Sequence, residues 1–145
     1  MSVPNPYRIV IADDHAPFRQ GLKSLLSKKS EVQVVGEAGD GIELLTLLNR
    51  LAMNQLNPHL VITDIVMPNL PGIEAARRIK VAYPEMKVLI LSMHREIEYV
   101  EHALSAGAHG YLTKADANDE LFSAIETVKK GGIYMSPLLR QGGNL

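Results

Sequence analysis

Five polar residues of the kinds that carry out chemistry stand at, or directly after, the ends of short apolar runs. They are Asp13, Asp14, Asp64, Ser92 and Lys114. If the runs are parallel strands, their carboxyl ends share one edge of a sheet, which is where open α/β folds bind ligands. Carboxylates crowded there repel one another unless a cation neutralises them, and Mg²⁺ prefers such oxygen ligands together with phosphate oxygens. The set predicts a Mg²⁺-dependent phosphoryl transfer to a carboxylate, with the ammonium and the hydroxyl contacting the anion.

Each of these residues also has an ordinary explanation when it is taken alone. An aspartate after a strand is often only a helix cap or a turn residue, which explains Asp14 or Asp64 equally well. A single lysine such as Lys114 is more often a solvated surface residue, and Ser92 alone is a weaker signal still. These ordinary roles do not predict that all five residues fall on the same edge of one sheet. Their joint placement therefore favours a functional site.

The elements that must position these residues follow from the hydrophobic pattern. Five short apolar runs alternate with segments of helical period, which is typical of βαβ units around a parallel sheet. The predicted strands cover residues 8–12, 32–38, 60–64, 87–92 and 110–113. The intervening segments carry apolar stripes, including Leu44, Leu47, Leu48 and Leu51, and later Ile97, Val100 and Leu104. Because each stripe can cover one face of the sheet, the sequence predicts a three-layer, doubly wound α/β fold with five parallel strands.

Local signals mark where some of these helices begin and end. Asp40 and Glu43 have the spacing of a capping box, and Pro17 suits the first turn of a helix. Lys129, Lys130 and Gly131 form a typical helix stop. These signals agree with the periodicity.

Composition limits the remaining possibilities. The 145 residues suit one domain, and 15 Lys plus Arg against 16 Asp plus Glu leave no global field that would attract nucleic acid or anionic lipid. The chain has no cysteine, which excludes a disulfide framework and a thiolate metal site and agrees with the reducing cytoplasm. Residues 1–6 lack the apolar run of a signal peptide or membrane span, so we expect an exposed lead-in and no membrane partner. We expect the domain at 7–130 and the start of a linker or tail at 131–145.

Four stretches of the chain follow one another in a characteristic order and spacing. They are residues 9–15 (IVIADDH), 61–68 (VITDIVMP, with Pro71 and Gly72 after it), 89–92 (LILS) and 106–114 (AGAHGYLTK). Together they resemble the receiver (CheY-like) domain of two-component response regulators, over roughly residues 7 to 130. The resemblance implies a flavodoxin-like (βα)5 fold with strand order 2-1-3-4-5. It also implies a signalling domain that catalyses only its own phosphorylation and dephosphorylation, not a turnover enzyme.

The resemblance assigns roles to the predicted site residues. Asp64 would accept a phosphoryl group from a sensor histidine kinase. The Mg²⁺ ligands would be Asp13, Asp14, Asp64 and the backbone carbonyl of Val66. Lys114 would pair with the phosphoryl group, and Ser92 would turn to donate a hydrogen bond to it.

A second set of residues would respond to phosphorylation or surround the pocket. Tyr111 would move inward as Ser92 moves and so reshape the face formed by the fourth helix, fifth strand and fifth helix; a static, partly buried tyrosine would use the same position, so that role stays open. Met67, Pro68 and His94 are expected at the pocket rim. Strand periodicity places His94 on the same side as Ser92, and we predict that His94 and Val66 control water access to phosphorylated Asp64.

Residues 12–15, 18–22 and 131–137 further resemble the LuxR/NarL-type subfamily, whose receivers precede a helix-turn-helix. This implies DNA binding only through an output domain outside the chain, and a possible homodimer on phosphorylation. Two other functions compete with this one. An aspartyl-phosphate phosphatase generally needs a second acid two residues after its nucleophile, but Val66 stands there. A pseudo-receiver that acts as an interaction module without phosphorylation stays open.

Overall fold

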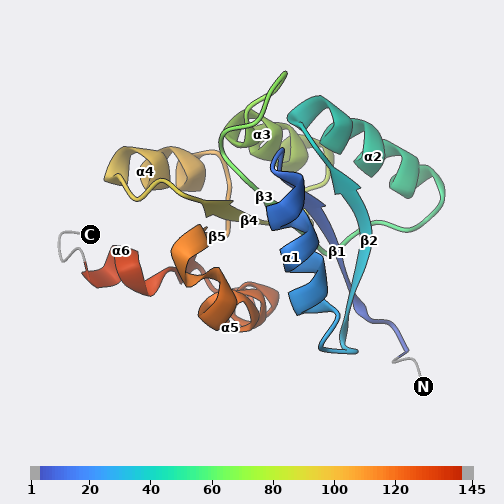
Figure 1. The fold of residues 1–145 in the computed structure, drawn as a ribbon. Helices are drawn as coiled ribbons and strands as arrows, with labels where there is room; N and C mark the ends of the chain where they lie inside the picture. The colour runs from blue at the N-terminus through green and yellow to red at the C-terminus, as the bar shows by residue number, and fades with distance from the viewer. Residues whose placement is uncertain (1–3, 142–145) are drawn as a thin grey trace.

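A central parallel sheet carries the fold in the computed structural model, which describes residues 4–141 (Figure 1). Within them the sheet has six strands in the order β2-β1-β3-β4-β5-β6, all paired in parallel. They are β1 (Tyr7–Ala12), β2 (Val32–Ala38), β3 (Leu60–Thr63), β4 (Lys87–Ser92), β5 (Gly110–Thr113) and β6 (Tyr134–Met135). The predicted order of the first five strands is confirmed. The prediction of five strands in total is wrong by one, because a two-residue strand is too short to produce a periodic signal.

Helices cover both faces of this sheet. They are α1 (Ala16–Leu26), α2 (Gly41–Met53), α3 (Gly72–Ala82), α4 (Ile97–Ser105), α5 (Ala117–Lys129) and the short α6 (Pro137–Gln141), with a 3-10 turn η1 (Lys114–Asp116) before α5. The helices α2, α3 and α4 pack on one face through buried residues such as Leu48, Ile79 and Val100 (Figure 1). The helices α1 and α5 pack on the other through residues such as Leu26 and Ile125. The doubly wound architecture follows from these two apolar layers.

The predicted helix boundary signals act as expected. The Asp40 carboxylate caps α2 by accepting a hydrogen bond from the Glu43 backbone N–H at 2.8 Å. Pro17 lies in the first turn of α1. After α5 ends at Lys129, Gly131 adopts a positive φ of 93°, a conformation that favours glycine at a helix terminus.

Strand register determines which residues meet at the carboxyl edge of the sheet. Ala12 pairs with Thr63, so the residues that follow them leave β1 and β3 side by side. Ser92 pairs with Thr113, which places the start of η1 beside the end of β4. All five predicted site residues therefore reach one edge.

Among the described helices, none combines the length and apolar character required to cross a lipid bilayer.

Candidate functional site

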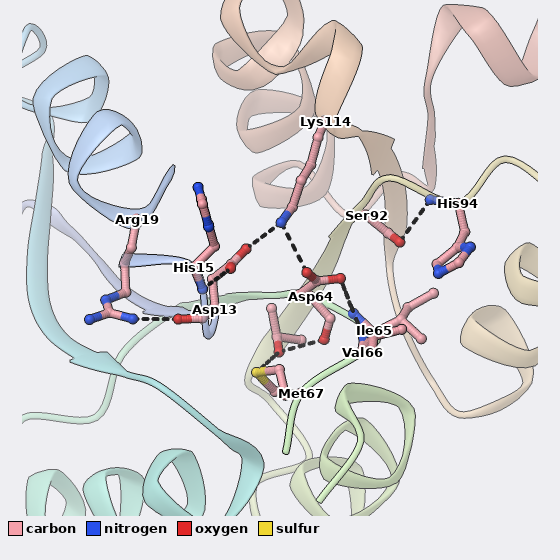
Figure 2. A network of polar contacts seen from close by, with 11 residues as sticks. Asp13, His15, Arg19, Asp64, Ile65, Val66, Met67, Ser92, His94 and Lys114 are labelled. Carbon is pink, nitrogen blue, oxygen red and sulfur yellow. Dashed lines mark hydrogen bonds and ion pairs between the residues drawn. The ribbon is translucent and has the colours of Figure 1, made fainter. Parts of the chain in front are cut away.

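The ammonium of Lys114 bridges the two buried aspartates that follow β1 and β3 (Figure 2). Its Nζ lies 2.7 Å from Oδ2 of Asp13 and 2.9 Å from Oδ2 of Asp64. Both aspartates are almost fully covered, with 2% of Asp13 and 8% of Asp64 exposed. Charges removed from water in this way require partners, and each partner of this triad is supplied by a different strand end.

The protonated form of Lys114 is favoured by its surroundings. Burial opposes the charge, but hydrogen bonds and charge attraction from Asp13 and Asp64 outweigh it and raise the pKa of Lys114 above its ordinary value. The ammonium also lies 4.3 Å from the centre of the Phe18 ring, a cation–π contact. Lys114 is therefore a cation at neutral pH, with its position restricted from two sides.

Three carboxylates at this edge are close enough to share one metal ion. Asp13, Asp14 and Asp64 each offer an oxygen within 4.8 Å of the others. Asp14 is exposed, whereas the other two are buried, so one side of the cluster faces water. Hard oxygen donors with room for water are what Mg²⁺ prefers. The donor set therefore fits Mg²⁺, which would have to share the Asp13 and Asp64 carboxylates with Lys114.

The backbone around Asp64 holds its carboxylate in one orientation. Oδ1 of Asp64 accepts hydrogen bonds from the backbone N–H groups of Ile65 at 2.7 Å and Val66 at 3.4 Å. The Thr63 hydroxyl donates to the Asp64 carbonyl at 3.0 Å. Oδ1 is thus turned toward the backbone while Oδ2 faces Lys114 (Figure 2).

Gly72, the first residue of α3, packs directly against the Asp64 backbone. A Cβ atom at Gly72 would lie 1.8 Å from the Asp64 carbonyl oxygen, and the Gly72 N–H donates to the Ile65 carbonyl at 2.8 Å. No side chain fits between these two segments. The sequence contains the Pro71-Gly72 pair, but only the packing gives the reason for the glycine.

Asp13 has its own supports, which the sequence reasoning missed. Its Oδ1 accepts from the His15 backbone N–H at 2.8 Å, and the Arg19 guanidinium donates to its carbonyl. Arg19 is held in turn by Glu37, with Nε 2.9 Å from Oε1. Phe18 and Arg19 lie about one helical turn after Asp14. This spacing is the sequence feature from which their proximity to the acidic pair could have been predicted.

Ser92 and Tyr111 both contact the same residue, His94. The fully buried Ser92 hydroxyl accepts from the His94 backbone N–H at 3.1 Å, and the Tyr111 hydroxyl donates to the His94 carbonyl at 2.8 Å. Tyr111 is fully buried, and this burial raises its pKa to about 12. The His94 ring stacks on Tyr99 with centroids 4.2 Å apart.

A cleft of about 910 Å³ opens above the aspartates. It is lined by Asp14, His15, Phe18, Asp64, Val66, Met93, His94, Arg95, Thr113, Lys114 and Ala115. Val66 is 55% exposed at its rim, and His94 is half-buried there. Met67 is buried in the core, where the Thr63 hydroxyl lies 3.9 Å from its sulfur. The structure brings Val66 and His94 to the cleft, but Met67 and Pro68 are not among the described residues that line it.

Comparison with known proteins identifies close similarities to one family. A model of the response regulator receiver domain matches residues 9–126. The transcriptional regulatory protein DegU of Brevibacillus brevis is 41% identical over 133 residues, which are 92% of this chain and 54% of that protein. The chain spans little more than half the length of the first curated relatives, between 54% and 61%.

Solved structures agree with this assignment. A LuxR-family two-component response regulator from an Aurantimonas species superposes with a TM-score of 0.85 and 34% identity, covering 94% of each chain. The isolated REC domain of RcsB from Salmonella enterica serovar Typhimurium, solved with the phosphomimetic BeF3⁻, gives a TM-score of 0.82 at 26% identity. It covers 94% of this chain and 98% of that one.

Proposed function

This chain belongs to the response regulator receiver family, of the LuxR/NarL type, and on that basis we propose that Asp64 accepts a phosphoryl group from the phosphohistidine of a sensor histidine kinase. The observation that carries the proposal is the bridge from Asp13 through Lys114 to Asp64, with a third carboxylate, Asp14, clustered beside the two bridged ones. A structural ion pair would not require the third carboxylate or an open cleft. Phosphoryl transfer to a carboxylate requires a nucleophile, carboxylates that hold a metal ion, an ammonium and an open cleft for the donor.

In the transfer, one carboxylate oxygen of Asp64 attacks phosphorus. The new O–P bond forms as the N–P bond of the donor breaks, and the electron pair stays on the imidazole nitrogen. Lys114 would stabilise the charge on the phosphoryl oxygens, and the Ser92 hydroxyl would donate a hydrogen bond to one of them. Mg²⁺, held by Asp13, Asp14, Asp64 and the Val66 carbonyl, would neutralise the crowded oxygens.

We further propose that His94 links the site to the output face. Ser92 and Tyr111 bond to opposite ends of the His94 residue, so a turn of Ser92 toward a phosphoryl group would disturb the Tyr111 contact. Tyr111 would act as the switch residue and reshape the α4–β5–α5 face. The expected partners are the kinase, a second copy of the chain after phosphorylation, and DNA through an output domain outside these residues. The proposed location is the cytoplasm.

The decisive experiment is incubation with acetyl phosphate and Mg²⁺, followed by intact mass measurement. We expect the mass of one phosphoryl group to be added, lost with hydroxylamine as an acyl phosphate should be, and not added when EDTA removes the metal. No uptake under any Mg²⁺ concentration would instead favour an interaction module without phosphorylation. Steady release of phosphate over many cycles would favour a turnover phosphatase.

The lifetime of the phosphorylated state should depend on the cleft rim. Val66→Ala and His94→Ala each remove bulk beside Asp64, so attacking water should reach the acyl phosphate more easily. We expect each lifetime to shorten more than about twofold, a barrier change above roughly 0.4 kcal/mol. The readout is the decay of the phosphorylated mass after removal of acetyl phosphate.

Val81→Ala is the matched control for the rim variants. Val81 is 83% exposed on α3 and does not line the cleft, so its removal should leave the lifetime unchanged. If both rim variants behave like Val81→Ala, the rim does not control water access.

A further inference from the structure

A buried serine from the C-terminal segment contacts the residues on both sides of Lys114. The Ser136 hydroxyl accepts from the Thr113 backbone N–H at 3.3 Å and lies 3.2 Å from the Thr113 hydroxyl. It also hydrogen-bonds to the Asp116 carboxylate, which accepts from the Thr113 hydroxyl at 3.2 Å as well. Ser136 is 0% and Thr113 1% exposed. The turn that presents Lys114 is therefore attached at both ends to one residue, which lies 23 positions after Thr113 and 20 after Asp116.

The segment that carries Ser136 is firmly packed on the domain. Strand β6 pairs with β5, the Ser136 N–H donates to the Tyr111 carbonyl at 3.0 Å, and the Leu138 N–H donates to the Asp116 carboxylate at 3.2 Å. Leu139 is 3% exposed and belongs to the same core cluster as Tyr111. Strand β6 forms one edge of the sheet, and Figure 1 shows α6 near the C-terminal end of the chain, beyond α5. Ser136 is thus fixed from both sides.

These contacts bear on Lys114 because Lys114 is the first residue of η1 and directly follows Thr113. The ammonium reaches Asp13 and Asp64 only if the first residue of η1 starts from the right place. Buried hydrogen bonds in a low-dielectric interior are costly to leave unmade, so the Ser136 contacts strongly favour one position of this turn. The turn η1 has only three residues, so few hydrogen bonds within it fix its position, and the contacts with Ser136 matter more.

We infer that Ser136 is a positioning residue for Lys114, acting through Thr113 and Asp116, so that the segment Tyr134–Leu139 is a working part of the phosphorylation site. The inference rests on the proposed function for its phosphorylation readout. It also has a second readout, since Lys114 has two opposed effects. Its ammonium would attract a phosphoryl group, and because it contacts the Asp13 and Asp64 carboxylates it would compete with Mg²⁺ for them.

The test is Ser136→Ala in the full 145-residue chain. We expect phosphorylation by acetyl phosphate at saturating Mg²⁺ to slow by about fivefold or more, as loss of a buried hydrogen bond would imply. We expect Mg²⁺ alone, titrated by calorimetry, to bind more tightly than in the parent. Thr113→Val should change both quantities in the same directions as Ser136→Ala. The conservative Thr113→Ser should return the phosphorylation rate and the Mg²⁺ affinity toward the values of the parent.

Leu51→Ala controls for a general loss of stability. Leu51 is buried on α2, which packs beside β2 at the opposite edge of the sheet, so its truncation loosens the domain without touching the Lys114 turn. A loosened domain should weaken Mg²⁺ binding and slow phosphorylation together. The opposite signs expected for Ser136→Ala would therefore be specific to a misplaced ammonium.

Two results would overturn the inference. One is Ser136→Ala phosphorylated as fast as the parent with unchanged Mg²⁺ affinity; the other is both quantities falling together, as in Leu51→Ala. If the parent takes up no phosphoryl group, the proposed function fails, and the Mg²⁺ titration alone decides. Tighter binding in Ser136→Ala would then still support the positioning role, and equal or weaker binding would end it.

Discussion

The Asp64→Asn chain should take up no detectable phosphoryl group from acetyl phosphate, a loss of at least about 1,000-fold in rate or roughly 4 kcal/mol of barrier. An amide oxygen is not a competent nucleophile, yet asparagine has nearly the same shape as aspartate. Its oxygen can still accept from the Ile65 N–H, which bonds Oδ1 of Asp64 at 2.7 Å. Lys114 keeps its contact with Asp13 at 2.7 Å. Intact mass after incubation with Mg²⁺ measures the loss, and circular dichroism checks that the fold is retained.

Asp14→Asn separates the nucleophile from the metal cluster. Asp14 belongs to the cluster of three carboxylates but is exposed. We expect it to slow phosphorylation by about tenfold at low Mg²⁺ and to recover at high Mg²⁺, because the nucleophile is intact and only metal affinity has fallen. Uptake by Asp64→Asn at a rate near that of Asp14→Asn would mean that another residue is the acceptor.

Gly72→Ala should destabilise the domain strongly, because the new methyl group has no space. The added Cβ would lie 1.8 Å from the Asp64 carbonyl oxygen and 2.9 Å from its carbonyl carbon, so backbone atoms must move. Overpacking costs about 1 to 3 kcal/mol in the free energy of unfolding, and we expect the upper end here because backbone atoms cannot rotate away. Because the displaced atoms belong to Asp64, phosphorylation should slow as well. Urea unfolding and the acetyl phosphate assay measure the two effects on the same sample.

Gly21→Ala makes the same chemical change where space is open. Gly21 lies inside α1, and a Cβ added there meets nothing within 4 Å. Alanine is favoured over glycine in helices, so this variant should gain roughly 0.5 to 1 kcal/mol and phosphorylate normally. A Gly72→Ala chain as stable as Gly21→Ala would show that α3 can shift away from Asp64 at little cost.

Much of the fold and the site could be predicted from local pattern. The predicted strands 32–38, 87–92 and 110–113 match β2, β4 and β5 residue for residue, because short apolar and β-branched runs favour the strands of a parallel sheet. The fourth helix shows where periodicity fails. Val100 is buried, but Ile97 and Leu104 are 38% and 36% exposed, and Ala103 takes the buried position instead. A stripe gives the period of a helix and leaves its rotation about the axis to packing.

The sequence by itself determined the alternation of strands and helices, and therefore the edge at which Asp13, Asp64 and Lys114 emerge. The alternation and the shared edge follow from the hydrophobic pattern of neighbouring residues and from the parallel direction of the strands. Only the tertiary structure decided that Lys114 bridges both aspartates, that Gly72 is pressed against Asp64, and that Ser136 attaches the Lys114 turn. Such contacts join residues that belong to separate elements, and their distances are set when those elements pack together, so no local pattern encodes them.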